Sequence, residues 1–347
     1  MIKIGIICPS EIAFRRFLPA LQKAKDFKFI GVAIASPFEW FGDDLHKTSI
    51  DIINNQQQEE SSKAKAFIDE YGGRMFQSYE DILRFSDVDA IYIPLPPALH
   101  YKWSKLAIEN GKHVLIEKPA TIDLNDTINL ISLAKDKSKV LHENYMFIYH
   151  NQLDALNEIV KSGLIGDIRL YRITFGFPRR PLNDFRYNKK LGGGALIDAG
   201  GYTIKYASFL LGITSKVICA NLNYISEFYV DIYGTATVIN EDGLTAQLAF
   251  GMDNDYKCDI EIWGSKGSIT SNRIMTAPDG FIPTYSLKIQ QNIEVRELPA
   301  DDAFYKSIIH FKDCIENISI REINYEAISN QAKLFTQFKK LAECKNV

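Results

Sequence analysis

Two patterns of hydrophobic and polar positions alternate over the first 120 residues. Short, almost continuously apolar runs are typical of strands that are covered on both faces of a sheet, and they occupy residues 2–8, 29–35, 89–93 and 112–117. Apolar residues at helical spacing separate these runs and predict helices at 12–25, 63–71 and 99–110. Strands that alternate with helices in this way predict an α/β fold with a doubly wound sheet of parallel strands.

Residues 37–62 interrupt this alternation. The segment is polar, contains several Gln and Asn residues, and is longer than a usual connection between a strand and a helix. We interpret it as an insertion, to which the sequence assigns no role.

A different pattern follows the first sheet. From about residue 167 onward, short runs of alternating apolar and polar residues are separated by Gly, Asn and Asp turns, which predicts a large, mainly antiparallel open sheet. A strand at 140–150 leads into this region. Further helices are expected at 123–135, 192–211, 305–316 and 325–344. We expect two domains, an α/β domain at 1–121 and an α+β domain at 122–347.

The composition is that of an ordinary globular protein. A chain of 347 residues suits two domains, and a net charge of -3 gives no electrostatic case for binding nucleic acid or a membrane surface. The five cysteines are widely scattered, without a CxxC or Cys/His cluster, so neither a disulfide framework nor a structural zinc site is indicated. We expect a soluble protein of the reducing cytoplasm.

Two motifs carry candidate chemistry. The glycine-rich stretch at 191–212, LGGGALIDAGGYTIKYASFLLG, places Asp198 and Tyr202 four residues apart and therefore on one helical face. Upstream, IEKPA holds Lys118 before Pro119 at the end of the predicted strand 112–117. Pro119 favours an extended conformation at Lys118. A lysine, an aspartate and a tyrosine form a workable set of proton-transfer groups.

Together these motifs, in this order and at this separation, resemble the glucose-fructose oxidoreductase / inositol dehydrogenase / MocA family of NAD(P)-dependent oxidoreductases. The resemblance covers most of the chain and implies a Rossmann-type dinucleotide-binding domain followed by a substrate domain. It also implies that Lys118 binds the reacting oxygen and the cofactor ribose, that Tyr202 is the acid/base, and that Asp198 anchors a substrate hydroxyl or shares its proton. Lys205 lies on the same helical face and could assist Tyr202. The alternative for Tyr202 is simple packing.

The loop after the first strand departs from the family pattern. The family carries G-x-G-x-x-G/A here, whereas this chain has Cys8, Pro9, Ser10, Glu11, Ile12 and Ala13. Only Ala13 keeps the pattern. A backbone N–H at Ser10 still permits phosphate binding at a helix N-terminus, and Ser10 or Pro9 could equally start a helix. We assign residues 8–12 to the cofactor site.

Further cofactor contacts follow from position. The second strand ends at Ser36 without an acid, which favours NADP(H) over NAD(H); Lys63 or Lys47 could supply the missing charge, unless both are merely solvated. The remaining residues assigned to the cofactor site lie at or just after strand ends and are Pro94, Leu95, Pro96, His100, Glu117, Lys118 and Asn144. His100 could instead cap or pack.

A basic stretch precedes the glycine-rich helix. Arg179, Arg180 and Arg186 could hold the phosphates of a nucleotide-linked sugar, or they could belong to a basic surface loop. We assign Arg186 to the substrate site with Lys118, Asp198 and Tyr202.

The sequence therefore predicts an NAD(P)-dependent oxidoreductase that transfers a hydride between a nicotinamide cofactor and a sugar, keto-sugar or polyol, free or nucleotide-linked. No metal is indicated. The resemblance implies a homodimer or homotetramer that covers one face of the open sheet. Two alternatives remain open: a non-catalytic dinucleotide-binding sensor or partner protein, and an NAD-dependent glycosidase.

Overall fold

The computed structural model describes residues 1–343 and divides into two compact units. Unit 1 contains residues 1–120, 128–144 and 308–325, and unit 2 contains residues 121–127, 145–307 and 326–343. The expected boundary after residue 121 falls near the first crossing between the units, and as a division into domains it stays a prediction. Cys344, where the last helix was expected to end, lies outside the described residues.

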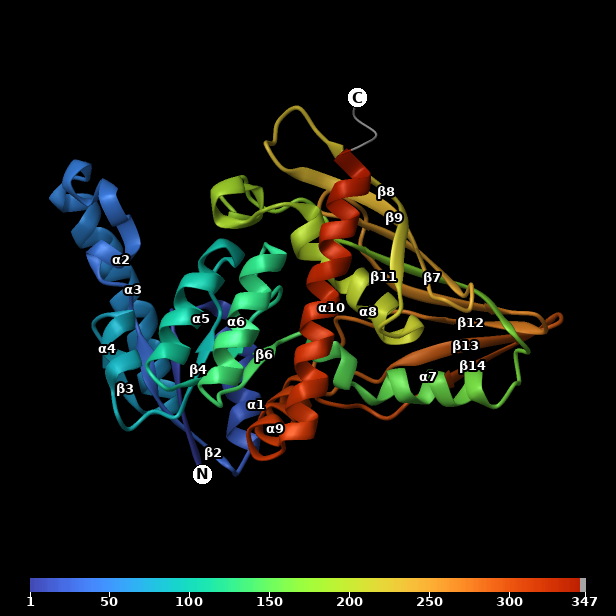
Figure 1. Ribbon diagram of the computed structural model, residues 1–347, viewed down its shortest axis with the longest axis horizontal. Helices are drawn as coiled ribbons and strands as arrows, with labels where there is room; N and C mark the ends of the chain where they lie inside the picture. The colour runs from blue at the N-terminus through green and yellow to red at the C-terminus, as the bar shows by residue number, and fades with distance from the viewer. Residues whose placement is uncertain (344–347) are drawn as a thin grey trace. The chain divides into compact units, whose positions relative to one another are not determined.

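Unit 1 is built on a six-stranded parallel sheet in the order β3-β2-β1-β4-β5-β6 (Figure 1). This is the strand order of dinucleotide-binding folds, and it confirms the predicted doubly wound sheet. The strands are β1 (Ile2–Ile7), β2 (Phe27–Ala33), β3 (Arg74–Phe76), β4 (Ala90–Ile93), β5 (His113–Ile116) and β6 (Leu141–Glu143). All four residues of the central strand β4 are buried, as a sheet covered on both faces requires.

The connections of this sheet are mostly helical. The π-helix η1 (Ala13–Phe17) runs into α1, and the 3₁₀ segments η2 (Gly42–Lys47) and η3 (Pro97–Leu99) precede longer helices. The helices are α1 (Leu18–Lys23), α2 (Pro37–Phe41), α3 (Ile50–Tyr71), α4 (Tyr79–Arg84), α5 (His100–Glu109) and α6 (Leu124–Asp136). The rings of Phe17 and Tyr92 stack at 3.9 Å between centroids and join the first helical segment to β4.

The polar segment 37–62 is helical in the structure. It forms α2, η2 and the first half of α3, which begins at Ile50 and not at Lys63 as the apolar pattern indicated. Serines start both helices: the Ser36 hydroxyl accepts a hydrogen bond from the Glu39 N–H, and Ser49 caps α3 in the same way. The segment therefore extends a helical layer and is not a loop.

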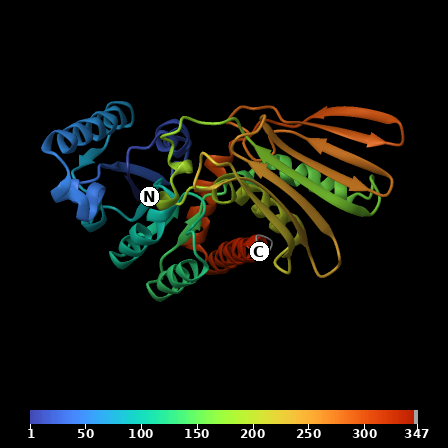
Figure 2. The same cartoon turned by 90° about the horizontal axis from the view of Figure 1, so that it is seen from above.

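Unit 2 is built on an eight-stranded sheet in the order β14-β13-β12-β11-β7-β10-β9-β8, which spans from yellow β8 to orange β14 (Figure 2). Neighbouring strands are antiparallel except β7 and β10, which are parallel, so the predicted mainly antiparallel sheet is confirmed. The strands are β7 (Ile168–Gly176), β8 (Lys216–Tyr224), β9 (Asp231–Ile239), β10 (Thr245–Gly251), β11 (Lys257–Gly264), β12 (Gly267–Ser271), β13 (Thr284–Ile289) and β14 (Asn292–Glu297).

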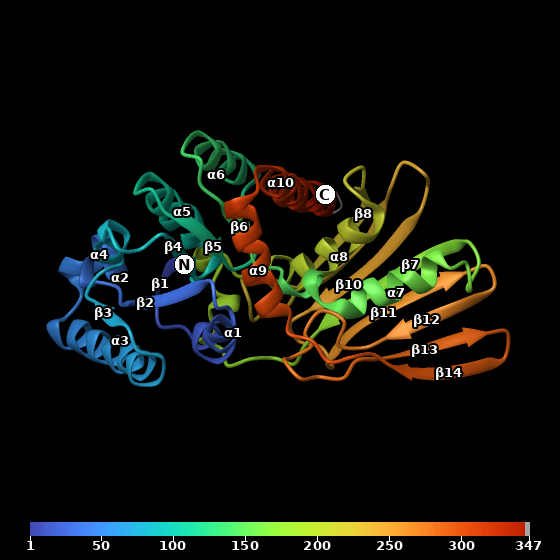
Figure 3. The ribbon, with the colours of Figure 1, turned by 90° about the horizontal axis from the view of Figure 1, so that it is seen from below.

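Helices cover one face of this sheet and form the core with it (Figure 3). The glycine-rich stretch forms the π-helix η7 (Leu196–Gly200) and α8 (Gly201–Leu211), and α8 packs on β7 and β10. The expected strand 140–150 is shorter than predicted, because β6 ends at Glu143 and the 3₁₀ helix η4 (Met146–Tyr149) follows. The other helical segments of the chain are α7 (Asn151–Lys161), η5 (Phe185–Tyr187), η6 (Lys189–Leu191), α9 (Ala303–Glu316) and α10 (Ile318–Glu343). Residues 308–325 of α9 and α10 belong to unit 1.

Among residues 1–343, none of the helices combines the length and the apolar character that crossing a membrane requires.

Candidate active site

The loop after β1 keeps a glycine-type backbone although its glycines are replaced. Cys8 has φ 76°, in the left-handed region that favours glycine. The Cys8 N–H donates to Ala33 O at 2.9 Å, and the Ser10 N–H donates to Cys8 O at 2.9 Å. The Ser10 hydroxyl accepts from the Ala13 N–H at 3.3 Å, which confirms the helix-cap interpretation. The loop therefore keeps a left-handed turn directly before a helix N-terminus, and phosphate binding there stays a prediction.

Glu39, in α2, is the first acid after β2 along the chain. Its carboxylate accepts from the backbone N–H groups of Ser36 at 2.7 Å, Tyr79 at 3.0 Å and Glu80 at 3.0 Å. Through these hydrogen bonds the carboxylate connects α2 to the start of α4. Glu39 is therefore a structural acid, and the assignment of Ser36 to the cofactor site stays a prediction.

Both lysines considered for an NADP phosphate already have carboxylate partners. Lys63 pairs with Glu59 at 2.8 Å and with the buried Glu60 at 3.2 Å, and Lys47 pairs with Asp44 at 3.1 Å. A role for either lysine in phosphate binding would require it to exchange these carboxylates for the phosphate.

His100 braces two loops of the predicted cofactor site. Its ring is fully buried, with Nδ1 2.7 Å from Pro119 O and Nε2 2.7 Å from Leu95 O. Burial lowers the pKa of His100 to about 4, against the two carbonyl acceptors, which raise it. This arrangement connects the Pro94–Pro96 loop to the residues that follow Lys118. A direct contact between His100 and the cofactor stays a prediction.

The two neighbours of the Lys118–Pro119 segment are held by side chains. Glu117 accepts from the Tyr92 hydroxyl at 2.7 Å and from the Asn144 amide at 2.6 Å, and burial raises the pKa of its carboxyl group. On the other side, the Ala120 N–H donates to Glu143 at 2.9 Å. These bonds fix the backbone on both sides of the partly exposed Lys118, at the carboxyl end of β5, where open α/β sheets bind their ligands.

In unit 2, Asp198 and Arg186 form an ion pair. The Arg186 Nε donates to Asp198 Oδ2 at 2.6 Å, and its Nη1 lies 3.1 Å from Asp184 Oδ1. The side chains of Arg186 and Asp198 are only 22% and 11% exposed. Burial opposes the charge of Arg186, but the two carboxylates outweigh it and raise the pKa of the guanidinium. Two of the predicted substrate-binding residues therefore lie together.

The Asp231 carboxylate explains the glycine at position 194, before this helix. Asp231 Oδ2 accepts from the Leu196 N–H at 2.6 Å and caps the start of η7. Gly194 has φ +125°, and a Cβ there would lie 2.4 Å from Asp231 Oδ1. Only glycine allows the backbone to approach the capping carboxylate so closely.

Tyr202 lies in an aromatic cluster that the sequence did not reveal. Its ring meets Tyr145 and Phe175 edge-on at centroid distances of 5.4 and 5.1 Å, and Phe147 is tilted against it at 5.7 Å. The Lys205 ammonium lies 5.4 Å from the centre of the Tyr145 ring. The run Tyr145-Met146-Phe147, placed directly after the Lys118 motif and its following strand, is the feature that could have indicated these contacts.

The other two arginines of the basic stretch have separate partners. Arg179 pairs with Glu227 and Asp253, each at 2.7 Å. The Arg180 guanidinium lies 5.2 Å from the centre of the Phe177 ring. The structure thus does not gather the three arginines around one anion, and the surface-loop interpretation fits Arg179 and Arg180.

The candidate residues therefore form two groups. The first is the Cys8–Ile12 loop, the Pro94–Pro96 loop and Lys118 in unit 1; the second is Arg186, Asp198 and Tyr202 in unit 2. A dinucleotide-type sheet with a supported lysine, together with an aspartate and a tyrosine on a glycine-rich helix, defines an NAD(P)-dependent oxidoreductase.

Comparison with known proteins identifies the family within this class. Residues 3–145 match the model of the oxidoreductase family with an NAD-binding Rossmann fold, and residues 153–270 match the GFO/IDH/MocA C-terminal domain. The chain belongs to the Gfo/Idh/MocA family. It is an NAD(P)-dependent oxidoreductase that acts on a sugar, keto-sugar or polyol.

Several relatives share most of the chain. The dTDP-3,4-didehydro-2,6-dideoxy-alpha-D-glucose 3-reductase of Actinomadura kijaniata is 35% identical over 90% of this chain and 87% of its own length. The corresponding reductase of Streptomyces violaceoruber is also 35% identical, over 90% and 85% of the two chains. A 3-ketoreductase from Actinomadura kijaniata, solved with NADP and TDP-benzene, has a TM-score of 0.86 at 33% identity, covering 98% of this chain and 97% of that chain.

Proposed function

We propose that this chain reduces the 3-keto group of a dTDP-linked deoxysugar, with NADPH as the hydride donor. The observation that carries the proposal is the pair Lys118 and Tyr202, each set in a supported position on its own unit. The relatives with 35% identity are reductases of this kind.

Solved variants of the similar 3-ketoreductase support the choice of these two residues. Structures of that protein exist with one lysine replaced by Ala or Glu and with one tyrosine replaced by Phe. The two positions lie the same number of residues apart in that protein as Lys118 and Tyr202 do here.

The proposed chemistry is a proton transfer coupled to hydride delivery. When bound, the reduced nicotinamide supplies the hydride to the C3 carbonyl carbon. As the carbonyl π electrons move to oxygen, the Tyr202 hydroxyl donates its proton to that oxygen, and the Lys118 ammonium group stabilises the developing charge by a hydrogen bond. The tyrosinate is reprotonated from solvent. Asp198, held by Arg186, accepts a hydrogen bond from a sugar hydroxyl and so orients the ring.

Preference for NADP(H) over NAD(H) is part of the proposal. Binding of the ribose diol of NAD calls for an acid at the end of β2. The nearby acid, Glu39, instead accepts three backbone N–H groups. The similar 3-ketoreductase was solved with NADP, which agrees with this assignment.

We also propose a homodimer or homotetramer that covers the outer face of the eight-stranded sheet. Trp263 and Tyr233 are 51% and 44% exposed on strands whose alternate residues are buried. The same face carries a polar ladder in which Arg172 contacts Gln247 and Glu261, so it is less apolar than an open sheet was expected to be. A cytoplasmic location likewise stays a proposal.

The deciding experiment compares wild type with Tyr202→Phe. Calorimetry should show NADPH bound more tightly than NADH, and dTDP competing with the sugar nucleotide. Tyr202→Phe should bind both with unchanged Kd but lose about 10² to 10⁴-fold in turnover, because only the proton donor is removed. Tyr206→Phe, which removes a hydroxyl one turn later on α8, is the matched control and should keep full turnover. Unchanged turnover in Tyr202→Phe would refute the assigned role, and failure of wild type to bind either dinucleotide would refute the proposed function.

A further inference from the structure

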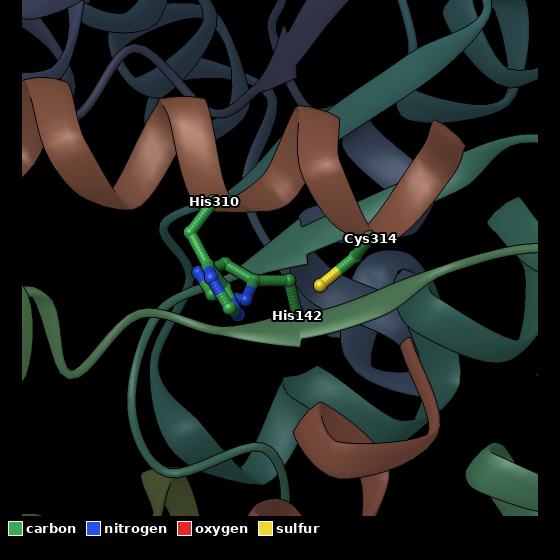
Figure 4. A group of neighbouring side chains, drawn as sticks. All are labelled: His142, His310 and Cys314. Atoms are coloured by element: carbon green, nitrogen blue, oxygen red, sulfur yellow. The ribbon is translucent and has the colours of Figure 1, made fainter. Parts of the chain in front are cut away.

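Two histidines and a cysteine from distant parts of the chain meet in unit 1. His142 lies on β6, while His310 and Cys314 lie on α9 (Figure 4). Their side-chain nitrogen and sulfur atoms all lie within 4.8 Å of one another. His142 and Cys314 are fully buried, and His310 is half-buried.

The backbone brings these side chains together for simple reasons. Successive strand residues point to opposite sides: Glu143 binds the Ala120 N–H, and its neighbour His142 points toward α9. On α9, His310 and Cys314 are four residues apart and share a helical face. The His142 ring also packs against Phe311 at 5.9 Å, which restricts its orientation.

Asn324 determines which nitrogen of His142 carries the proton. The Asn324 amide nitrogen donates to Leu141 O at 2.8 Å, so its oxygen is the acceptor that lies 3.0 Å from His142 Nδ1. His142 therefore donates from Nδ1 and presents the lone pair of Nε2. Histidines that bind metals are held in this way, with one ring N–H on an oxygen acceptor and the other nitrogen on the ion.

We propose that His142, His310 and Cys314 bind one Zn²⁺ ion. Two imidazole nitrogens and one thiolate are ligands that Zn²⁺ prefers, and a water completes the tetrahedron. The set contains no carboxylate, so it does not suit Mg²⁺ or Ca²⁺. The ion joins the edge strand β6 to α9, and so ties residues 308–325 to the parallel sheet.

The surroundings are compatible with a bound cation. Arg321 is the nearby positive group, and its guanidinium is held by the carbonyl oxygens of Cys314 and Ile315. Because the ligand is a thiolate, binding the ion releases the Cys314 thiol proton to solvent.

The test uses Co²⁺ as a spectroscopic substitute for Zn²⁺ in untagged, metal-free protein. Wild type should take up one Co²⁺ per chain, with a thiolate-to-cobalt charge-transfer band and the visible bands of a four-coordinate ion, and one equivalent of Zn²⁺ should abolish both. Cys314→Ser should lose the charge-transfer band, and His310→Gln should bind Zn²⁺ at least tenfold more weakly. Cys219→Ser and His46→Gln, at exposed positions on other elements, are the matched controls and should behave as wild type.

Two results would overturn the site. One is folded wild type that shows no thiolate band at one equivalent of Co²⁺, and the other is a band that persists in folded Cys314→Ser. Circular dichroism establishes folding in each case. If Cys314→Ser does not fold, the wild-type spectrum and stoichiometry decide alone. Neither readout depends on the proposed reductase activity.

Discussion

Gly201 is the position at which the packing around the candidate active site is most easily tested. It begins α8 directly before Tyr202, and a Cβ added there would lie 2.2 Å from the Tyr145 hydroxyl oxygen and 3.0 Å from Phe335 Cζ. Tyr145 is fully buried. The Gln331 amide, on α10, fixes both groups: it donates to Gly201 O at 2.9 Å and to the Tyr145 hydroxyl at 3.4 Å. Gly201→Ala therefore requires the helix or the ring to move.

The expected cost follows from two opposing effects. Overpacking a rigid core costs about 1 to 3 kcal/mol, while Ala is better than Gly in a helix by about 1 kcal/mol. Gly201→Ala should therefore destabilise the protein by up to about 2 kcal/mol. Tyr145→Phe removes the oxygen at 2.2 Å and leaves the ring carbon at 3.3 Å. The contact with Phe335 Cζ at 3.0 Å remains in that background, but the gain from Ala in the helix offsets it. The same substitution should therefore cost little there, and the two changes should be coupled by up to about 2 kcal/mol.

Urea unfolding of the four proteins, wild type, both single variants and the double variant, measures this coupling. Circular dichroism and tryptophan fluorescence should be followed together, because a chain of two units can unfold in two transitions. Trp40 and Trp103 lie in unit 1 and Trp263 lies in unit 2, so the fluorescence reports on both units. Turnover should fall with stability in Gly201→Ala, since the displaced residue lies next to Tyr202. An equal cost of Gly201→Ala in both backgrounds would refute the steric argument.

Two further predictions concern a half-buried histidine, His113, and the altered cofactor loop. The Nδ1 of His113 accepts from the Val140 N–H at 3.1 Å, and burial, aided by Lys139, lowers its pKa to about 4. Because an unfolded histidine has a pKa of about 6.5, the unfolded chain binds one more proton than the folded chain between pH values of about 4 and 6.5, and the free energy of unfolding should fall on acidification by up to about 1.4 kcal/mol per pH unit. His113→Asn should remove this one-proton contribution from the slope of the free energy of unfolding in urea against pH. An unchanged slope would contradict the argument. Cys8→Gly should be more stable than Cys8→Ala by about 1 kcal/mol in the same assay, because only glycine adopts φ 76° without strain; equal stabilities would argue against strain at Cys8.

The buried strands could be predicted from sequence, whereas the helix α3 could not. Apolar runs locate β1, β2, β4 and β5 because both faces of the sheet are covered. The helix α3 buries only Glu60, Ala64 and Phe67 of its 22 residues. Its first half therefore lacks the apolar stripe from which a helix is predicted, and the remaining evidence is the serine cap at Ser49.

Candidate catalytic residues were predictable where the chemistry is local to a motif. Asp198 and Tyr202 share a helical face because of their spacing, and Lys118 ends a strand. The groups that support them come from elsewhere: Arg186 reaches Asp198 from the preceding loop, and Tyr145 meets Tyr202 from the end of β6. Such contacts depend on tertiary packing, which spacing along the chain does not encode.

The proposed zinc site shows the same limit more strongly. His142 precedes His310 by about half the chain, so no short pattern such as CxxC joins them. Only the His310–Cys314 spacing on one helical face is visible in sequence, and alone it is common in helices without metals. The site emerges because the final helices return to the first sheet, a topology that carries residues 308–325 into unit 1.

The cofactor loop illustrates the opposite case, in which a motif is lost but its geometry remains. The glycines of G-x-G-x-x-G serve a left-handed turn and close approach of a phosphate. In this chain Cys8 adopts the left-handed conformation, and the Ser10 N–H still closes the turn onto Cys8 O. The strain of one residue at positive φ is about 1 kcal/mol, which is small against the stability of a buried sheet. A dinucleotide-binding fold can therefore tolerate the loss of its glycines at this position, and the departure from the motif is weak evidence against cofactor binding.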